Sequence, residues 1–278
     1  MHLVSCTSAN FGAQPLGYRM SERGEGARVS EERFRPLPTF RERFGALAAQ
    51  IHAMGFEWVD VWVRHVNWTW ATDEHIAIAR EELARHGLQV TSLAGNMGKT
   101  LDDFRRACRL AAGLRARRLG GNTPLVASDP GAVVRELEAA DLVFGIENHP
   151  ADHTPADILA KIPADAGGRI GTTVDTGWWA TQGYDAAKAV RELGRHVVQV
   201  HLKDVTAPGR HETCRFGEGV VPLQDCVAAM AEIGFDGPVS VEHEPEDHDP
   251  TEDIVASREM LQTWLATPIP PIGRQSTE

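Results

Sequence analysis

Residues 170–201 read IGTTVDTGWWATQGYDAAKAVRELGRHVVQVH, and this stretch decides the fold. A short apolar run rich in β-branched residues (170–175) precedes an amphipathic stretch (186–193), and a second apolar run (197–201) follows. Strand, helix and strand in that order form a βαβ unit, whose two strands lie parallel in one sheet. The stretch therefore predicts an α/β protein built on a parallel sheet.

The same alternation extends over the chain and gives eight strand and helix pairs. The predicted strands are 2–6, 58–63, 89–93, 117–120, 143–147, 170–175, 197–201 and 239–242. The predicted helices are 41–54, 73–86, 101–114, 130–140, 154–161, 186–193, 222–233 and 251–263. Eight parallel strands that each lead into a helix close into a single (β/α)8 TIM barrel, and 278 residues suit one such domain.

The barrel is expected to occupy residues 1–266, and the proline-rich tail 267–278 is expected to pack loosely. Residues 8–38 form a long segment rich in glycine and arginine after the first strand, where a barrel places a loop of its catalytic face. Long loops of compact domains are often lids or binding segments, so we expect a lid there, with a disordered insertion as the alternative.

The composition restricts the partners of the chain. Its 28 basic and 39 acidic residues give a formal net charge of −11, which repels nucleic-acid phosphates and anionic lipid surfaces. The first residues lack the basic and apolar regions of a secretion signal, and no apolar run approaches the ~20 residues that span a bilayer. We therefore expect a cytoplasmic protein that binds neither nucleic acid nor membrane. Its four cysteines include no CxxC pair, so we expect reduced thiols.

Four consecutive predicted strands, the fifth to the eighth, each end in a residue that can bind a metal ion. These residues are Glu147 in FGIENHP, Asp175 in TTVDTGWW, His201 in VVQVHLKD and Glu242 in VSVEHEP. With 39 acidic residues and 12 histidines among 278, four such endings in succession would rarely arise by chance. A parallel barrel points the residues at neighbouring strand ends into one pocket, so we expect the four side chains to converge.

Three carboxylates and one imidazole in a buried pocket need a neutralising charge, because unpaired carboxylates are costly in a medium of low dielectric constant. A divalent cation supplies that charge directly. The oxygen-rich set favours Mn²⁺, with Mg²⁺ or Co²⁺ as alternatives, over a closed zinc site of the cysteine type. Salt bridges to surface arginines are the structural alternative for the same acids.

These segments resemble the sugar isomerase and epimerase superfamily, the xylose isomerase-like barrels that include tagatose and psicose 3-epimerases, hydroxypyruvate isomerase and inosose dehydratase. The resemblance extends over the whole barrel pattern. Its specific part is an ordered set of motifs, of which HLKD and VEHEP are the most distinctive: IEN (146–148), VDTG (174–177), HLKD (201–204), GEG (217–219) and VEHEP (241–245).

The resemblance implies that Glu147, Asp175, His201 and Glu242 bind one divalent metal ion and that the two glutamates are the catalytic acid and base. A metal ion that holds a substrate carbonyl and the neighbouring hydroxyl makes the adjacent C–H acidic and stabilises the enediolate. Return of the proton from the opposite glutamate inverts the carbon, whereas return to the next carbon on the same face interconverts aldose and ketose. The sequence leaves both outcomes open.

One position departs from the superfamily pattern. Many members carry a histidine three residues after the aspartate ligand, whereas this chain has Trp178 followed by Trp179. An aromatic wall in place of a polar contact argues against 3-epimerisation of a free sugar. It favours a substrate with an apolar or ring face, such as a cyclic polyol, a keto-glycoside or an aryl conjugate. Packing between helix and strand is the structural alternative for both tryptophans.

Besides Trp178, six residues on the same predicted face are candidates for substrate binding: His65, Asn96, Asn122, His149, Lys203 and Arg210. The histidines and asparagines could bind substrate hydroxyls. The ammonium of Lys203 could stabilise a developing oxyanion, and Arg210 lies where similar proteins often carry a substrate-binding arginine. A satisfied histidine, a loop asparagine or a local ion pair is the structural alternative in each case.

The sequence thus predicts a divalent-metal-dependent isomerase or epimerase of a sugar, keto-sugar or cyclic polyol. A lyase that eliminates a β-group after the same deprotonation, like inosose dehydratase or C-glycoside-cleaving relatives, is the first alternative, and a change of product mass would distinguish it. A non-catalytic sugar-binding barrel is the second. The negative charge and the missing histidine after Asp175 disfavour a phosphodiesterase of the endonuclease IV type. Similar proteins are commonly dimers or tetramers, so a homo-oligomer is expected.

Overall fold

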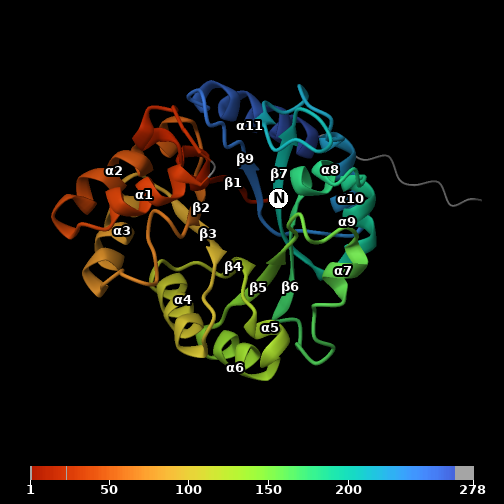
Figure 1. The fold of residues 1–278 in the computed structure, drawn as a ribbon, viewed down its shortest axis with the longest axis horizontal. Helices are drawn as coiled ribbons and strands as arrows, with labels where there is room; N and C mark the ends of the chain where they lie inside the picture. Colours follow the sequence, from red (N-terminus) through yellow and green to blue (C-terminus); the bar gives the residue numbers. More distant parts are fainter. Residues whose placement is uncertain (1, 23, 267–278) are drawn as a thin grey trace, which may run out of the picture.

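The computed structural model describes residues 2–22 and 24–266, and in it eight parallel strands close into a barrel (Figure 1). Strand β1 pairs with β2 and β9, and β7 pairs with β6 and β9, so the sheet closes on itself. The predicted TIM barrel is confirmed. Its strands are β1 (Val4–Thr7), β2 (Trp58–Trp62), β3 (Gln89–Asn96), β4 (Arg118–Asn122), β5 (Val143–Glu147), β6 (Ile170–Asp175), β7 (Val197–Val205) and β9 (Val239–Glu242).

The helices that follow the strands cover the outside of the barrel (Figure 1). They are α2 (Leu37–Ala53), α3 (Asp73–Arg85), α4 (Leu101–Gly113), α6 (Pro130–Ala140), α7 (Pro155–Leu159), α9 (Ala186–Leu193), α10 (Leu223–Glu232) and α11 (Thr251–Ala266). Helices α6 and α9 have the predicted bounds. Helix α6 begins as its sequence indicates, because the Asp129 side chain accepts a hydrogen bond from the Ala132 amide and Pro130 occupies the first turn.

The segment 8–38 is not the single irregular loop that its composition suggested. It contains η1 (Ser8–Phe11), η2 (Gln14–Leu16) and α1 (Glu25–Phe34), so that prediction is wrong. Tertiary contacts stabilise α1 in spite of its glycine: Phe34 is buried against the ring of His65, and the Ser30 hydroxyl donates to the Gly12 carbonyl. The segment still follows β1 on the face to which the strands point their carboxyl ends.

Four other short elements were not predicted. Helix α5 (Leu125–Ser128) precedes α6, and helix α8 (Thr176–Thr181) follows β6 directly. The turn η3 (Gly194–His196) leads into β7, and β8 (Thr213–Cys214) pairs antiparallel with the end of β7. All four are too short to show a hydrophobic period, which for a helix is read over about 11–18 residues, so the pattern does not detect them.

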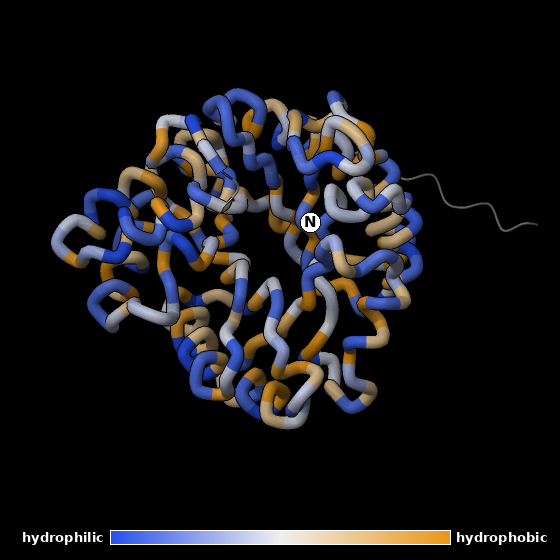
Figure 2. Tube along the Cα trace, in the orientation of Figure 1, coloured by the Kyte–Doolittle hydropathy of each residue, from blue (hydrophilic) through white to orange (hydrophobic). Residues whose placement is uncertain are grey.

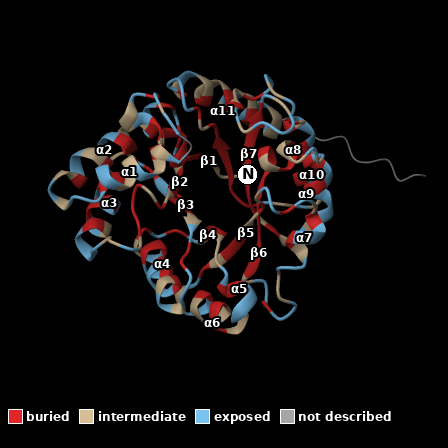
Figure 3. Ribbon diagram, in the orientation of Figure 1, coloured by how far each residue is buried: buried red, intermediate tan, exposed pale blue. Residues whose placement is uncertain are grey.

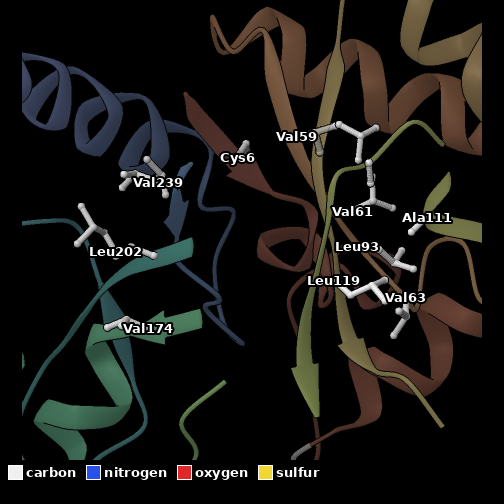
Figure 4. Packing of buried hydrophobic residues seen from close by; sticks show 14 of the residues in the cluster. Cys6, Val59, Val61, Val63, Leu93, Ala111, Leu119, Val174, Leu202 and Val239 are labelled. Atoms are coloured by element: carbon white, nitrogen blue, oxygen red, sulfur yellow. The ribbon is translucent and has the colours of Figure 1, made fainter. Parts of the chain in front are cut away.

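The barrel separates an apolar layer outside the strands from a polar layer inside them. Figure 4 shows Val61, Leu93 and Leu119 of three successive strands next to Ala111 of α4. Asp60, Ser92 and Gln199 alternate with such residues along their strands, and all three are fully buried. Figures 2 and 3 show buried residues in the strands and hydrophilic, exposed positions on the outer sides of the helices. The polar layer gives charged side chains in the barrel interior groups to which they can hydrogen-bond.

No helix within the described ranges is long and apolar enough to cross a membrane. The four cysteines are free thiols. Burial raises the pKa of Cys108 and of Cys214 to about 12, so both are protonated at neutral pH. The predicted tail, residues 267–278, lies outside the described residues.

Candidate active site

Strand alternation and register bring the four predicted metal ligands to one end of the barrel. Along β7, Val200 and Leu202 belong to the hydrophobic core, so His201 and Lys203 point to the interior. His201 is in register with Asp175 of β6, and Lys203 is in register with Glu242 of β9. The ends of these strands therefore meet at the same height in the barrel.

His201 lies between the two glutamates that the sequence assigned to proton transfer. Its Nδ1 atom lies 3.2 Å from Glu147 Oε1 and 3.0 Å from Glu242 Oε2. Its Nε2 atom lies 2.7 Å from Oδ2 of Asp60, a fully buried residue of β2 on the other side of the barrel. Without a metal ion, Nδ1 carries a proton that it shares with the glutamates. If an ion displaced that proton, Nε2 would keep its own proton directed at Asp60, which is how an outer carboxylate holds a metal-binding histidine.

Lys203 places an ammonium group among three carboxylates. Its Nζ atom lies 2.5 Å from Glu242 Oε1, 2.9 Å from Asp175 Oδ2 and 3.1 Å from Glu244 Oε2. Its side chain is 5% exposed. The acids of the site thus pair with a buried lysine from the neighbouring strand and not with surface arginines, which were the structural alternative.

The charges of this cluster fix the protonation states. Burial works against the charged forms, yet the carboxylates of Glu242 and Asp60 raise the pKa of His201 well above 6.5, and three acids raise the pKa of Lys203 well above its usual value. Burial also works against ionised Glu147, but the hydrogen bond and charge of His201 lower its pKa to about 2. Glu147 is therefore a carboxylate at neutral pH, as a base must be.

The sequence around Asp175 explains how this residue is held. Its backbone amide donates to Asn148 Oδ1 and its carbonyl accepts from Asn148 Nδ2, so the IEN and VDTG motifs are joined. Its Oδ1 atom caps α8 by accepting from the Trp178 amide. Gly177 leaves room for Lys203, since a Cβ there would lie 2.7 Å from the lysine side chain. Only Oδ2 of Asp175 is left to face the cluster.

The donor set fits a divalent cation. Asp175 Oδ2 and Glu242 Oε2 are buried and have no hydrogen-bond partner, although each lies close to a cationic side chain. Three carboxylates and one imidazole are hard, oxygen-rich ligands, as Mn²⁺ and Mg²⁺ prefer. Within the described chain no three of the four donor groups have ligand atoms that all lie within 4.8 Å of one another, and the Lys203 ammonium occupies part of the space between them. An entering ion would take over some of the contacts of Lys203.

An aromatic and imidazole rim lies next to these carboxylates. The Trp178 ring stacks on His149 with a centroid distance of 5.9 Å and meets His211 edge-on at 4.4 Å. Lys203 Nζ lies 5.5 Å from the same ring. His149 Nε2 is 3.9 Å from Glu147 Oε2, and its Nδ1 contacts Asn122 Nδ2 at 3.1 Å. Trp178, His149 and Asn122 are therefore beside the cluster, whereas Trp179 is fully buried in the core.

Three predicted substrate-binding residues are not brought to the cluster. His65 is 1% exposed, contacts Ser8 Oγ at 3.0 Å and packs on Phe34, so it has the environment of a satisfied structural histidine. The Asn96 side chain accepts from the Gly98 amide within its own loop. Arg210 is largely exposed and its recorded ion pair, at 3.5 Å, is with Glu212.

Sequence analysis missed Asp60, Gln199 and Glu244. Gln199 Nε2 donates to Asp60 Oδ2 at 3.0 Å, and Glu244 contacts Lys203. Asp60 and Gln199 carried a signal, because each is a polar residue in the middle of an apolar strand and must find a partner when buried. The GEG motif also has a structural explanation: the amides of Gly217 and Gly219 donate to Asp204 Oδ2.

Comparison with known proteins agrees with the barrel fold. The model of the family described as "Xylose isomerase-like TIM barrel" matches residues 48–264. L-ribulose-5-phosphate 3-epimerase UlaE of Shigella boydii serotype 18 is 36% identical over 72 residues, which are 26% of this chain and 25% of that protein. UlaE of Escherichia coli K12 is 35% identical over 72 residues. The matched part is thus about a quarter of the length of these curated relatives.

Solved structures share the fold at low sequence identity. D-allulose 3-epimerase from Methylomonas sp. aligns with a TM-score of 0.66 at 15% identity, over 95% of this chain and 98% of that one. IolI protein "with a binding zinc atom" aligns with a TM-score of 0.68 at 13% identity, over 94% and 97%. A probable 3-DHS dehydratase, AsbF from Bacillus anthracis, aligns with a TM-score of 0.60 at 13% identity, over 94% and 99%. With its closed barrel and a family match over most of its length, the chain belongs to the xylose isomerase-like TIM barrel family.

Proposed function

We propose that this protein is a divalent-metal-dependent isomerase or epimerase of a sugar, keto-sugar or cyclic polyol, and that it transfers a proton next to a substrate carbonyl. One observation carries the proposal: Glu147 and Glu242 approach the same His201 nitrogen from different strands, at 3.2 and 3.0 Å. Two carboxylates on different sides of one point suit the removal and return of a proton.

The metal would be held by Glu147, Asp175, His201 and Glu242, with Mn²⁺ the first candidate and Mg²⁺ or Co²⁺ the alternatives. When bound, the ion supplies polarisation of the substrate carbonyl and the adjacent hydroxyl. The buried oxygens of Asp175 and Glu242, which have ion-pair partners but no hydrogen bond, and the outer contact of His201 with Asp60 support this assignment. Lys203 stays an ammonium because three acids surround it, so it can hold a developing oxyanion.

The two glutamates would perform the proton transfer. The lowered pKa of Glu147 keeps it ionised and able to accept the substrate proton at neutral pH. Return of that proton from Glu242 to the other face inverts the carbon, whereas return by Glu147 to the neighbouring carbon moves the carbonyl. Trp178 and His149 would contact a ring or apolar face of the substrate, because they form the rim beside Glu147.

A lyase reaction is the second candidate, and Trp178 is the observation that favours it. Its ring takes the place of a polar contact with free-sugar oxygens, and it could stack on the leaving portion of a keto-glycoside or on a cyclic keto-polyol. Loss of a β-group after the same deprotonation would use the same glutamates.

The experiment is a deuterium exchange assay with mass detection. Wild type loaded with Mn²⁺ is incubated in deuterated water with keto-sugars, inososes, keto-glycosides and L-ribulose 5-phosphate, the last because partial relatives are named for it. Deuterium uptake at constant substrate mass supports the isomerase or epimerase, and loss of water or an aglycone indicates the lyase. Tight sugar binding without exchange or mass loss would contradict both and favour a non-catalytic barrel.

A further inference from the structure

A second group of metal-binding side chains lies outside the site described above. Within the described residues, His243, His248 and Asp253 each offer one ligand atom, and these three atoms all lie within 4.8 Å of one another. His243 follows the last residue of β9, His248 lies in the next loop and Asp253 is in the first turn of α11. Within the described residues none of the three has a hydrogen bond or ion pair with Glu147, Asp175 or His201, although His243 directly follows Glu242 in the chain.

The spacing of these atoms suits a small, tightly bound ion. His243 Nε2 lies 3.4 Å and His248 Nε2 lies 3.3 Å from Asp253 Oδ2. Zinc binds nitrogen and oxygen at about 2.0–2.2 Å, so two ligands of a tetrahedral ion are separated by about 3.4 Å. Both pairs of donors are therefore close to the edge of such a tetrahedron.

The other polar atom of each donor residue already has a partner. His248 Nδ1 lies 2.7 Å from Asp247 Oδ1, and His243 Nδ1 lies 2.8 Å from Thr213 Oγ1. Asp253 Oδ1 accepts two hydrogen bonds from a single arginine, Arg215, at 2.6 and 2.8 Å. Such outer contacts fix the orientation of metal-binding histidines and carboxylates and leave one atom of each to face the ion.

The buried member of the group points independently to a ligand. His243 is 0% exposed, and its buried Nε2 atom has no hydrogen-bond partner beyond a long contact, at 3.4 Å, with Asp253 Oδ2. Buried polar atoms are rarely left in this state, because such an atom loses its contacts with water and gains none in return. A cation at the point shared with His248 and Asp253 would satisfy this nitrogen.

We propose that His243, His248 and Asp253 form a second metal site, which takes a transition-metal ion such as Zn²⁺ and fastens the loop between β9 and α11. Two imidazoles and one carboxylate are softer ligands than the carboxylate-rich principal site, so Mg²⁺ should not occupy this position. The His248 side chain is 48% exposed, which leaves room for water as a fourth ligand. The site would hold in place the loop that carries Glu244, whose carboxylate contacts Lys203.

The test is zinc stoichiometry measured by elemental analysis on the untagged full chain, after removal of all metal and equilibration with Zn²⁺. His248→Ala should bind one equivalent less than wild type, and His248→Cys should restore it, because a thiolate also binds zinc. His52→Ala is the matched control, since His52 is an exposed histidine of α2 and should leave the stoichiometry unchanged. His248 is half-exposed, so its removal should not unfold the chain.

The same comparison in a Glu147→Gln background separates the two sites. There too, His248→Ala should remove one equivalent, whatever the principal site binds. Zinc should also raise the melting temperature of the wild type by more than that of His248→Ala. Equal zinc content in wild type and His248→Ala, or a Glu147→Gln chain that binds no zinc at all, would overturn the second site without affecting the proposed reaction.

Discussion

Two histidines of the barrel, His201 and His65, are almost equally buried and have opposite protonation. Carboxylates surround His201 and raise its pKa, whereas His65 meets only Ser8 and aromatic rings, so burial lowers its pKa to about 3. The difference extends to their neighbours. We call the ends of β5, β6, β7 and β9 the ionisable arc, because their charged side chains pair with one another. We call the ends of β1 to β4 the packed arc, because their side chains make local hydrogen bonds or pack.

Burial alone therefore does not identify a functional residue in this barrel. The ionisable arc is distinguished by charged side chains that are both buried and paired. Their desolvation costs free energy, and a barrel with a purely structural role would not need them. Asp60 and Asn122 are exceptions in the packed arc, because Asp60 reaches across the barrel to His201 and Asn122 contacts His149 beside the cluster.

The largest effect is expected for the two glutamates. Glu147→Gln and Glu242→Gln should each slow deuterium exchange into the substrate by about 10²–10⁴-fold, since general acid–base catalysis contributes that much. Glu42→Gln, an exposed glutamate of α2, is the control and should exchange like the wild type. An exchange rate in either active-site variant within threefold of the control would remove the glutamates from the mechanism.

Lys203→Met should strongly destabilise the metal-free protein. It leaves Asp175, Glu242 and Glu244 without their buried cation, which costs about 3–5 kcal/mol of unfolding free energy in a urea titration. Saturating Mn²⁺ should recover part of that loss. Lys188→Met removes a lysine with a 62% exposed side chain and should change stability by under about 1 kcal/mol. An equal loss of unfolding free energy in the two lysine variants would show that the charge of Lys203 does not stabilise the ionisable arc.

Asp60→Asn should weaken metal binding by about 10–100-fold, because an outer carboxylate orients the metal-binding histidine. The metal concentration for half-maximal exchange should rise, while kcat at saturating metal should change much less. Asp102→Asn, at an exposed position of α4, is the control. Unchanged metal affinity in Asp60→Asn would show that Asp60 does not orient His201 for metal binding and has a structural role only, like the other residues of the packed arc.

The smallest effect concerns pH and the packed arc. His65 binds a proton with a pKa of about 3 when folded and 6.5 when unfolded, so between these values the unfolded state binds more protons. The stability contributed by neutral His65 is present above pH 6.5 and is lost as the pH falls toward 3. The unfolding free energy of His65→Gln should therefore fall less steeply with acid than that of wild type, by up to about 1.4 kcal/mol per pH unit. Parallel curves would contradict this assignment.

The sequence predicted the ionisable arc better than the packed one, for physical reasons. Glu147, Asp175, His201 and Glu242 each follow an apolar run, and parallel strands aim such ends at one point, so their convergence follows from the pattern. The packed arc offers no such rule. His65 follows a predicted strand and His201 ends one, but α1 covers His65, and that helix lies in a segment whose glycines and arginines indicated a loop.

The sequence also did not predict the contacts between side chains on opposite sides of the barrel. Asp60 sits in the middle of WVDVW, and nothing in those letters says that its partner lies 141 positions later at His201. Lys203 was placed on the correct face by strand alternation, but its three acidic partners come from β6, β9 and the following loop. Such pairings depend on barrel closure, which sets the distance between strands far apart in the chain.

The most direct test of the central claim measures metal occupancy and proton exchange on the same samples. Metal-free wild type is titrated with Mn²⁺, and bound metal and the rate of deuterium uptake into the best substrate are determined at each point. The account predicts no uptake without metal and a rate that rises in proportion to occupancy up to one equivalent, with Glu242→Gln inactive throughout. Uptake at full rate in the metal-free protein, or a metal-saturated protein that exchanges no proton with any substrate of the panel, would contradict it.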